Sequence, residues 1–298
     1  MPVRDAFGRA PRSAAGEDAY RVRRTGGATF FTSRQQHDDL TVVFKRFEPR
    51  GALPDDAPTF VLVHGLGVSS RYFHPLAAEL ARSARVWLVD LPGYGAAPDP
   101  RRDVTLVDHA GALAAALRTA GIEKPVLVGH SMGSNVVSLV AERDPDVTDR
   151  IVLLAPTLEP QLRRPGRAIR RLLADAFREP PRVFAIAASD YLIRCGLPYM
   201  LRQLPHLLED RVEERMERLQ ARVLVVDGDR DPIVPNHWVH HLAKGVPDTE
   251  SRIVRGPHVI MHTDPVATAR WMLAFAHATD GQAWDADDDA VLERGADA

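Results

Sequence analysis

Cysteine is almost absent from this 298-residue sequence, which contains Cys195 alone. A single thiol excludes an internal disulfide and a metal site built from four cysteines, and it fits a reducing compartment such as the cytoplasm. No apolar run approaches the roughly 18 residues that a membrane-spanning helix requires. The first twenty residues also lack the apolar segment of an export signal. We therefore expect a soluble protein that stays in the cytoplasm.

An excess of charge of either sign is also missing. The 38 basic residues nearly balance the 40 acidic ones, and the formal net charge is −2 at pH 7. Without a positive field there is little to hold a polyanion, so nucleic acid is not an expected partner. Because 45% of the residues are hydrophobic, a chain of this length can bury about three-quarters of its unfolded surface, and a globular fold is predicted.

Short β-rich runs alternate with longer helical patterns along most of the chain. The runs are TFF (29–31), LTVVFKRF (40–47), TFVLV (59–63), VWLV (86–89), PVLVG (125–129), IVLL (151–154), VLVV (223–226) and RIV (252–254). This rhythm predicts an α/β fold with a mostly parallel central sheet flanked by helices. The first two runs suit an edge hairpin. Helical spacing from Val107 to Leu117 predicts a helix that ends at Gly121.

The composition divides the chain into four kinds of region. They are a loose lead-in (1–27), an α/β core in two parts (28–155 and 220–278), a helical cap (156–219) and an acidic tail (279–298). The cap is predicted because the segment far exceeds the dozen or so residues that a crossover needs. Its helices are expected to break at Pro165, Pro180-Pro181, Gly196-Leu197-Pro198 and Pro205.

The sharpest motif is Gly129-His130-Ser131-Met132-Gly133, which fits G-x-S-x-G between a predicted strand and a predicted helix. A sharp strand-to-helix turn would expose the hydroxyl of Ser131, and glycines on both sides would avoid clashes there. A serine hydroxyl needs a base to remove its proton and an acid to orient that base. Ser131 is therefore the candidate nucleophile.

Two later segments supply the base and the acid. His258 follows one predicted strand in Gly256-Pro257-His258, and Asp231 follows another in GDRDPIVP (228–235). The three side chains would lie beyond the C-terminal ends of different strands, where ligand sites form in open parallel sheets. The alternatives are His262 as the base and Asp227, Asp229 or Glu159 as the acid.

Backbone N–H groups are the expected stabilisers of an oxyanion. The candidates are the amides of Leu66, in HGLG (64–67), and Met132, at the start of the helix after Ser131. His64 and His130 are predicted to support these groups by packing or hydrogen bonding. This machinery needs no metal or other cofactor. His237, His240 and His241 belong to a segment that is predicted to be one exposed helix, so no metal site is expected there.

Together these motifs resemble the α/β-hydrolase superfamily, in its cap-bearing branch. The resemblance covers roughly residues 28–278 and rests on HGLG (64–67), DLPGYG (90–95), GHSMG (129–133), GDRDPIVP (228–235) and GPHVIMHTDP (256–265). In that superfamily the acid after the seventh strand usually sits in G-x-x-D and the histidine closely follows a glycine. The resemblance therefore points to Asp231 and His258, with Asp90 in a structural role.

The resemblance implies a hydrolase, and we expect a serine enzyme that cleaves a small, largely apolar carboxylic ester or thioester through an acyl-enzyme. Ser131 stands where haloalkane dehalogenases and epoxide hydrolases carry Asp. His130 and Val259 differ from the Asn and Trp of C–C bond hydrolases, and hydroxynitrile lyases place Lys at the position of Val259. C–C hydrolysis, cofactor-free haloperoxidase or perhydrolase activity, acyl transfer or cyclisation, and a low-turnover receptor are the alternatives.

The cap contains a basic stripe formed by Arg163, Arg164, Arg167, Arg170 and Arg171. Ile169, Leu172, Leu173 and Phe177 lie at helical spacing and would form the buried face of the same segment. The arginines would then be a solvated face, or a basic rim that attracts an anionic or carrier-bound small-molecule substrate. An apolar pocket under the cap and ordinary cap packing are equal alternatives for Tyr191, Leu192, Ile193, Leu197, Tyr199, Met200 and Leu201.

Overall fold

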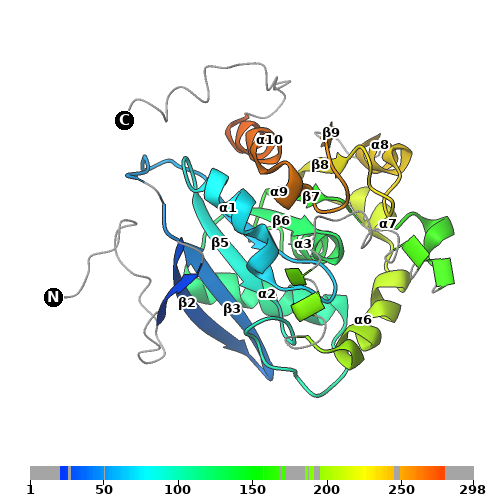
Figure 1. Cartoon of the computed structure of the whole chain (residues 1–298), viewed down its shortest axis with the longest axis horizontal. Coiled ribbons are helices and arrows are strands. Elements are labelled where there is room, and N and C mark those ends of the chain that lie inside the picture. Colours follow the sequence, from blue (N-terminus) through cyan, green and yellow to red (C-terminus); the bar gives the residue numbers. More distant parts are fainter. Residues whose placement is uncertain are drawn as a thin grey trace.

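The protein forms a single twisted sheet with helices packed on both faces (Figure 1). The computed structural model describes residues 21–25, 28–49, 51–156, 158–164, 166–167, 170–171, 185–186, 188–190, 195–244 and 249–278. The predicted tail at 279–298 and the buried cap face around Ile169 to Phe177 lie outside these residues. The sheet and its helices confirm the predicted α/β class.

Nine described strands form the sheet, in the order β1-β2-β3-β5-β4-β6-β7-β8-β9. Their bounds are β1 (Arg21–Thr25), β2 (Ala28–His37), β3 (Leu40–Phe47), β4 (Thr59–Val63), β5 (Arg85–Asp90), β6 (Val126–His130), β7 (Arg150–Leu154), β8 (Arg222–Gly228) and β9 (Thr249–Val254). The pairs from β1 to β3 and the pair β3/β5 are antiparallel, and all other pairs are parallel. The parallel strands therefore end at one edge.

The N-terminal hairpin is larger than the sequence predicted. TFF is only part of β2, because every residue from Phe30 to His37 pairs with β3. The prediction that residues 1–27 form a loose lead-in is wrong for Arg21–Thr25, which pair with β2 as β1. This short, arginine-rich segment lacks the apolar alternation that marks a strand, and its pairing with the edge of β2 comes from main-chain hydrogen bonds.

The helices cover the two faces of the sheet. Their bounds are η1 (Ser70–Phe73), α1 (His74–Leu80), α2 (Leu106–Ala120), α3 (Met132–Arg143), η2 (Pro160–Leu162), α6 (Leu197–Glu209), α7 (Val212–Met216), α8 (Asn236–Lys244), α9 (Ile260–Thr263) and α10 (Pro265–His277). Alternate strand residues serve opposite faces: Val61 and Val63 pack in the cluster with α2, α3 and α8, whereas Phe60 and Leu62 pack with α1, α9 and α10.

The helix α2 has the ends that its sequence predicts. Thr105 and Asp108 form a reciprocal capping box at its start. Gly121 ends it in the left-handed conformation, with φ of 64°, which confirms the predicted stop.

The segment between β7 and β8 contains η2, α6 and α7 among its described residues. Pro205 does not break a helix, contrary to the prediction, but lies inside α6. A proline inside a helix lacks the N–H that would bond the carbonyl of Leu201, four residues earlier, and its ring crowds that carbonyl.

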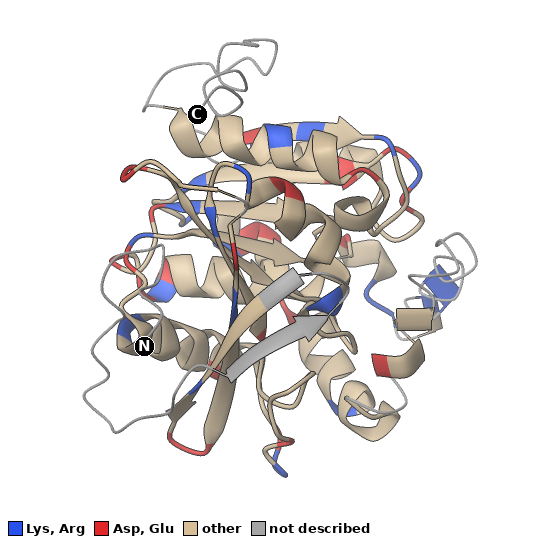
Figure 2. Ribbon diagram, turned by 60° about the vertical axis from the view of Figure 1, so that its left-hand side comes forward, with Lys and Arg blue, Asp and Glu red and all other residues tan. Residues whose placement is uncertain are grey.

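Acidic and basic residues are interspersed along the described helices and strands (Figure 2). Within the described ranges, no helix combines the length and apolarity needed to span a membrane.

Candidate active site

Ser131 occupies the sharp turn between β6 and α3. Its backbone has φ of 52° and ψ of −119°, a conformation that side-chain-bearing residues rarely adopt. A Cβ atom on Gly129 would approach the carbonyl oxygen of Gly133 to 2.2 Å, and one on Gly133 would approach the carbonyl oxygen of Val63 to 2.2 Å. Only glycine fits at both flanking positions, so the predicted strand-to-helix turn is present.

His258 and Asp231 form a buried pair at the same edge of the sheet. The His258 Nδ1 to Asp231 Oδ2 distance is 2.6 Å, and the two side chains are 6% and 0% exposed. The other oxygen of Asp231 accepts hydrogen bonds from the amides of Ile233, at 2.6 Å, and Val234, at 3.1 Å. Burial raises the pKa of Asp231, but the adjacent His258 and these hydrogen bonds outweigh burial and lower it below its ordinary value. The carboxylate of Asp231 thus lies against Nδ1 of the His258 imidazole.

The hydrogen bond between an acid and the base is formed by Asp231 and His258, and the alternative residues have other positions or partners. Asp229 is exposed and accepts from the amide of Gly256 at 2.8 Å. Glu159 is paired with His237, with 2.8 Å between Oε2 and Nε2. Asp227 is buried next to Asp231. His262 stands on the short helix α9, and the residue bonded to Asp231 is His258.

The HGLG loop after β4 lies against the elbow. A Cβ atom on Gly65 would be 3.2 Å from Cβ of Ser131, so a side chain at position 65 would crowd the turn. Leu66 follows Gly65 in the loop, and Met132 is the first residue of α3, directly after Ser131. The loop that contains the amide of Leu66 and the start of α3 thus meet beside the candidate nucleophile.

His64 and His130 serve as hydrogen-bonding supports, in line with the prediction. Nε2 of His64 accepts from the amide of Leu91 at 3.1 Å, so its Nδ1 donates to the carbonyl of Gly65, at 2.8 Å. Burial lowers the pKa of His64. His64 therefore ties the HGLG loop to the end of β5.

Tyr72 completes a second chain of hydrogen bonds that the sequence did not reveal. Its hydroxyl accepts from the amide of Gly65 at 2.9 Å and lies 2.7 Å from Nδ1 of His130. Nε2 of His130 lies 3.1 Å from the carbonyl oxygen of His258, which can only accept, so Nε2 holds the proton and Nδ1 accepts from Tyr72. Burial, reinforced by the nearby His258, lowers the pKa of His130 well below its ordinary value. A neutral His130 thus links three loops of the site.

Asp90, at the end of β5, has a structural role. Its buried carboxylate lies 2.6 Å from Nζ of Lys45 and accepts from the amides of Ser70, at 3.0 Å, and Ala96, at 2.8 Å. Burial raises the pKa of Asp90, but Lys45 and the other partners lower it overall to about 2. These contacts fasten the loops after β4 and β5 to the strand β3.

The depressed pKa of Asp90 predicts a loss of stability in acid. Because the folded-state pKa of about 2 lies below the unfolded value of about 3.9, the contribution is present above pH 4 and disappears as the pH falls to 2. We expect the parent protein to lose about 2 to 3 kcal/mol of unfolding free energy from this group across that window. Urea unfolding followed by circular dichroism at pH 4, 3 and 2 measures the loss.

Asp90→Asn should be less stable at pH 7 and should lack this part of the acid slope. Asp149→Asn is the matched control, because Asp149 is 55% exposed on a loop at the other end of the sheet. An unchanged slope in Asp90→Asn would contradict the assignment.

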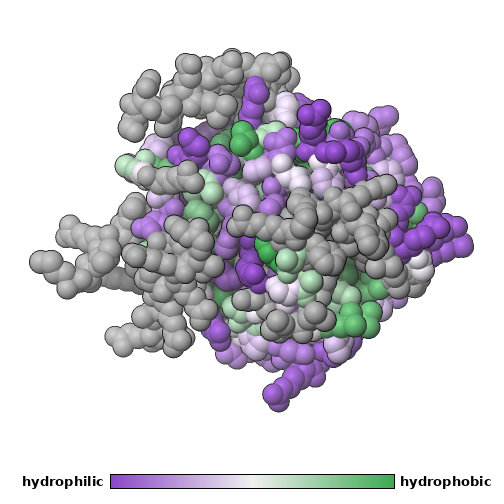
Figure 3. Space-filling model, viewed as in Figure 1, coloured by the Kyte–Doolittle hydropathy of each residue, from purple (hydrophilic) through white to green (hydrophobic). Residues whose placement is uncertain are grey.

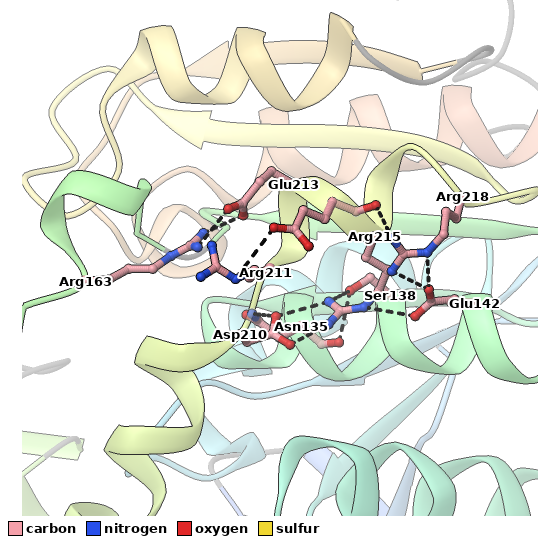
Figure 4. Close-up of polar contacts among 10 residues, drawn as sticks. Asn135, Ser138, Glu142, Arg163, Asp210, Arg211, Glu213, Arg215 and Arg218 are labelled. Atoms are coloured by element: carbon pink, nitrogen blue, oxygen red, sulfur yellow. Dashed lines mark hydrogen bonds and ion pairs between the residues drawn. The ribbon is translucent and has the colours of Figure 1, made fainter.

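Three arginines of the basic cap stripe have protein partners. Arg163 forms two hydrogen bonds with Glu213, at 2.5 and 2.8 Å (Figure 4). Arg167 donates to the carbonyl of Gln161, and Arg171 donates to the carbonyl of Pro232, directly after Asp231. Arg164 and Arg170 are exposed. Most of the stripe thus fastens the segment between β7 and β8 to its surroundings.

A buried polar cluster joins the same segment to α3 (Figure 4). Arg215, which is 5% exposed, donates to Ser138 Oγ at 3.0 Å and binds Asp210 through both terminal nitrogens. Asn135 donates to Asp210 at 2.5 Å, and Glu142 lies 3.4 Å from Nε of Arg215. The elbow helix is thereby connected to the region after α6.

The helix α6 docks through Tyr199 and leaves other apolar side chains outside. Tyr199 is buried and donates to the carbonyl of Pro92 at 2.9 Å, while a Cβ atom on Gly93 would meet its ring at 2.3 Å. Leu197 and Leu201 are each 50% exposed, where Figure 3 shows an apolar patch over α6. Tyr199 and the partly buried Met200 pack against the core, whereas Leu197 and Leu201 are half exposed. Tyr191, Leu192 and Ile193 lie outside the described residues.

The histidines of α8 have separate partners. His237 pairs with Glu159, His240 lies 2.9 Å from Ser251 Oγ, and His241 stacks on Trp238. Among the described residues there is no group of three metal-ligating side chains. The three histidines are exposed, but α8 buries Trp238, Val239 and Leu242 against the sheet, so only one face of the helix is open.

Comparison with known proteins identifies the fold and the motifs. Residues 58–190 match the family model described as alpha/beta hydrolase fold. The enol-lactonase of Burkholderia xenovorans LB400 superposes with a TM-score of 0.70 at 19% identity, covering 83% of this chain and 100% of that one. The chain has the α/β-hydrolase fold. A hydrolase from Pseudomonas aeruginosa PA01 also gives a TM-score of 0.70, at 18% identity, over 83% of this chain and 98% of that one.

A relative within the superfamily matches across most of the chain. RutD of Pseudomonas savastanoi pv. phaseolicola, to which carbamate hydrolase activity is provisionally assigned, is 28% identical over 246 residues. The match covers 75% of this chain and 95% of RutD. The family-model match and the shared fold confirm the resemblance drawn from the five motifs.

Proposed function

We propose that this α/β-hydrolase is a serine hydrolase that cleaves a small, largely apolar carboxylic ester or thioester. In this proposal the Ser131 hydroxyl attacks the acyl carbon while His258 takes its proton. His258 then returns the proton to the leaving group, and water cleaves the acyl-enzyme by the same route. Asp231 holds the imidazole with Nδ1 as the donor, which leaves Nε2 to act as the base.

The observation that carries the proposal is the buried contact of 2.6 Å between His258 and Asp231. An ionised carboxylate on Nδ1 favours the tautomer needed at Nε2 and stabilises the imidazolium that forms during attack. The strained backbone of Ser131 at the end of β6 supports its role, because such strain persists where function requires it.

The amides of Leu66 and Met132 are the proposed donors to the oxyanion. The HGLG loop packs against Ser131, and Met132 opens α3, whose 12 residues direct free N–H groups and the positive end of the helix dipole toward this point. The tetrahedral intermediate would place its negative charge there. No cofactor is needed for any step of this scheme.

Carbamate hydrolysis is a second candidate, favoured by the similarity to RutD. The same nucleophile and oxyanion donors would serve a carbamate carbonyl, and the two candidates differ only in the leaving group and in the acyl part. Matched aryl esters and carbamates with one leaving group would separate them through kcat/KM. C–C hydrolysis, haloperoxidase or perhydrolase activity, acyl transfer and cyclisation would appear in product analysis with water as the only nucleophile.

Labelling with a fluorophosphonate tests the proposed nucleophile. We expect intact mass spectrometry to show one adduct on the parent protein and none on Ser131→Ala, because only an activated serine attacks phosphorus. Ser134→Ala is the matched control, because Ser134 lies in α3 only three residues after Ser131. This variant should still be labelled. An adduct that persists in Ser131→Ala would refute the assignment, and a parent protein that gives only a stoichiometric burst with an aryl ester would favour a receptor.

We further propose a cytoplasmic location and a small-molecule substrate. The buried free thiol of Cys195, whose pKa burial raises to about 12, supports the former because it has no partner for a disulfide. The exposed Arg164 and Arg170 would weakly attract an anionic or carrier-bound substrate.

A further inference from the structure

A buried carboxylate from the segment between β7 and β8 binds the loop that follows the HGLG motif. Asp190 is fully buried, and its Oδ2 accepts from the amide of Ser69 at 2.9 Å and from the hydroxyl of the same residue at 2.6 Å. Its Oδ1 forms an ion pair with Nη1 of Arg71 at 3.0 Å. Burial of a carboxylate is unfavourable unless such partners replace its lost hydration. The loop therefore supplies the donors and the cation that Asp190 needs.

The short helix η1 begins between two buried carboxylates. The amide of Ser69 donates to Asp190, and the next amide, that of Ser70, donates to Asp90 at 3.0 Å. Asp90 has its own cation in Lys45, which also donates to Ser70 Oγ at 2.9 Å. Ser69 is the N-cap of η1, but its hydroxyl bonds Asp190 instead of capping the helix. The inserted segment and the sheet thus each hold one of two consecutive residues at the start of this turn.

The helix η1 carries Tyr72, which reaches the candidate oxyanion loop. The hydroxyl of Tyr72 accepts from the amide of Gly65 at 2.9 Å, and Gly65 directly precedes Leu66, the proposed oxyanion donor. A hydrogen bond from the amide of His74 to the carbonyl of Arg71 closes η1 as one tight turn, so a shift of its first residues also moves Tyr72. A continuous series of contacts therefore leads from the inserted segment through η1 to the oxyanion loop.

We propose that Asp190 is a positioning residue for the oxyanion donor at Leu66, contributed by the segment between β7 and β8. The inference rests on the proposed function, since it assigns Asp190 to the support of the same site. With Asp190 bound to the start of η1, Tyr72 stays against Gly65 and the amide of Leu66 keeps its direction. The inserted segment then contributes to catalysis, because the two amides that begin the turn are both held only while this segment is docked.

Asp190→Ala and Asp190→Asn test the proposal through kcat and KM for an activated aryl ester. Alanine removes the acceptor of Ser69 and the anion beside Arg71, so we expect kcat to fall about 10- to 100-fold while KM stays within about twofold of the parent value. Asparagine keeps an oxygen that can accept from Ser69, so the kcat of Asp190→Asn should lie between those of the parent and Asp190→Ala.

Glu213→Gln is the matched control for the loss of an ion pair. Glu213 is a partly buried carboxylate that binds Arg163 within the same inserted segment, and its kcat should stay near the parent value after substitution. An Asp190→Ala enzyme as active as Glu213→Gln would overturn the proposal. A raised KM with an unchanged kcat in Asp190→Ala would also overturn it, because that pattern indicates lost substrate binding.

An inhibitor that forms a tetrahedral adduct reports on the oxyanion donors themselves. A trifluoromethyl ketone with the acyl part of the ester adds to the serine hydroxyl and places a negative charge where the oxyanion forms. Its Ki should rise in Asp190→Ala by the same factor by which kcat/KM falls. A Ki that stays at the parent value would contradict a role for Asp190 in positioning these donors.

Hydrogen exchange measured by mass spectrometry tests the coupling without using catalysis. In Asp190→Ala, the peptide that spans residues 64–73 should exchange about tenfold faster than in the parent, whereas residues 106–120 of α2 should not change. Unchanged exchange over residues 64–73 would refute the inference, and Asp190→Asn gives the same comparison if alanine prevents folding. Because this measurement does not depend on Ser131, it separates a failure of this inference from a failure of the proposed function, which the labelling of Ser131→Ala reports.

Discussion

Asp231→Asn should lower kcat by about 10⁴-fold while leaving KM for a small ester nearly unchanged. The reason is that the two oxygens of the Asp231 carboxylate have different partners. One oxygen accepts from the amides of Ile233 and Val234, so the asparagine oxygen should occupy that side. The amide NH₂ group would then face Nδ1 of His258 and donate to it, which moves the imidazole proton to Nε2. His258 could no longer accept the proton of Ser131.

Initial rates with an activated aryl ester measure this loss. Asp229→Asn is the matched control, because it makes the same change in the same loop at an exposed residue that does not contact His258, and its kcat should stay near the parent value. An Asp231→Asn enzyme within tenfold of the parent would show that the orienting acid is another residue. Glu159→Gln and Asp227→Asn would then be the next variants to assay.

Arg215→Met should reduce the free energy of unfolding by about 3 to 5 kcal/mol, the largest effect on stability that we expect. Asp210 is almost buried and binds Arg215 through both oxygens, with only Asn135 as another described partner. Glu142 would also lose a charged neighbour. Methionine fills much of the same volume, so the loss would come from the carboxylates that are left buried without a cation rather than from a cavity.

Urea unfolding at pH 7 gives the free energy directly. Arg218→Met removes an arginine from the same cluster that is 58% exposed, and it should cost less than about 1 kcal/mol. The double variant Arg215→Met/Asp210→Asn should recover part of the loss, because the unpaired charge is removed as well. An Arg215→Met protein within about 1 kcal/mol of the parent would contradict the proposed contribution of the cluster.

The bounds of helices and strands were predicted most accurately where apolar runs and turn residues mark the same boundary. The strands at 40–47 and 59–63 have the predicted bounds, and Gly121 ends α2 as expected. Both kinds of signal are local: side-chain alternation defines a strand, and a left-handed glycine stops a helix. The identity of the fold followed because several such segments occurred in a recognisable order.

Features that depend on contacts distant in sequence were harder to predict. β1 is stabilised by pairing with β2, and α6 continues past Pro205, where the local sequence predicts a break. Sequence motifs predicted three candidate catalytic residues of the site, which are Ser131, Asp231 and His258. The hydrogen bonds of Tyr72 could not, because a tyrosine in a loop has no distinctive spacing and its partners lie on other elements. Asp227, a rival acid on sequence grounds, is fully buried in β8, and the carboxylate bonded to His258 is that of Asp231.

The fit of Tyr199 against Gly93 bears on how chimeric enzymes could be built from this scaffold. The aromatic ring takes the space that any side chain at position 93 would need. A transplanted segment without an equivalent ring would leave an unfilled gap over the loop at 90–95, whereas a host with a larger residue at 93 would clash with Tyr199 of α6. Successful exchange of substrate preference between relatives would therefore have to move that loop and the insertion as one module.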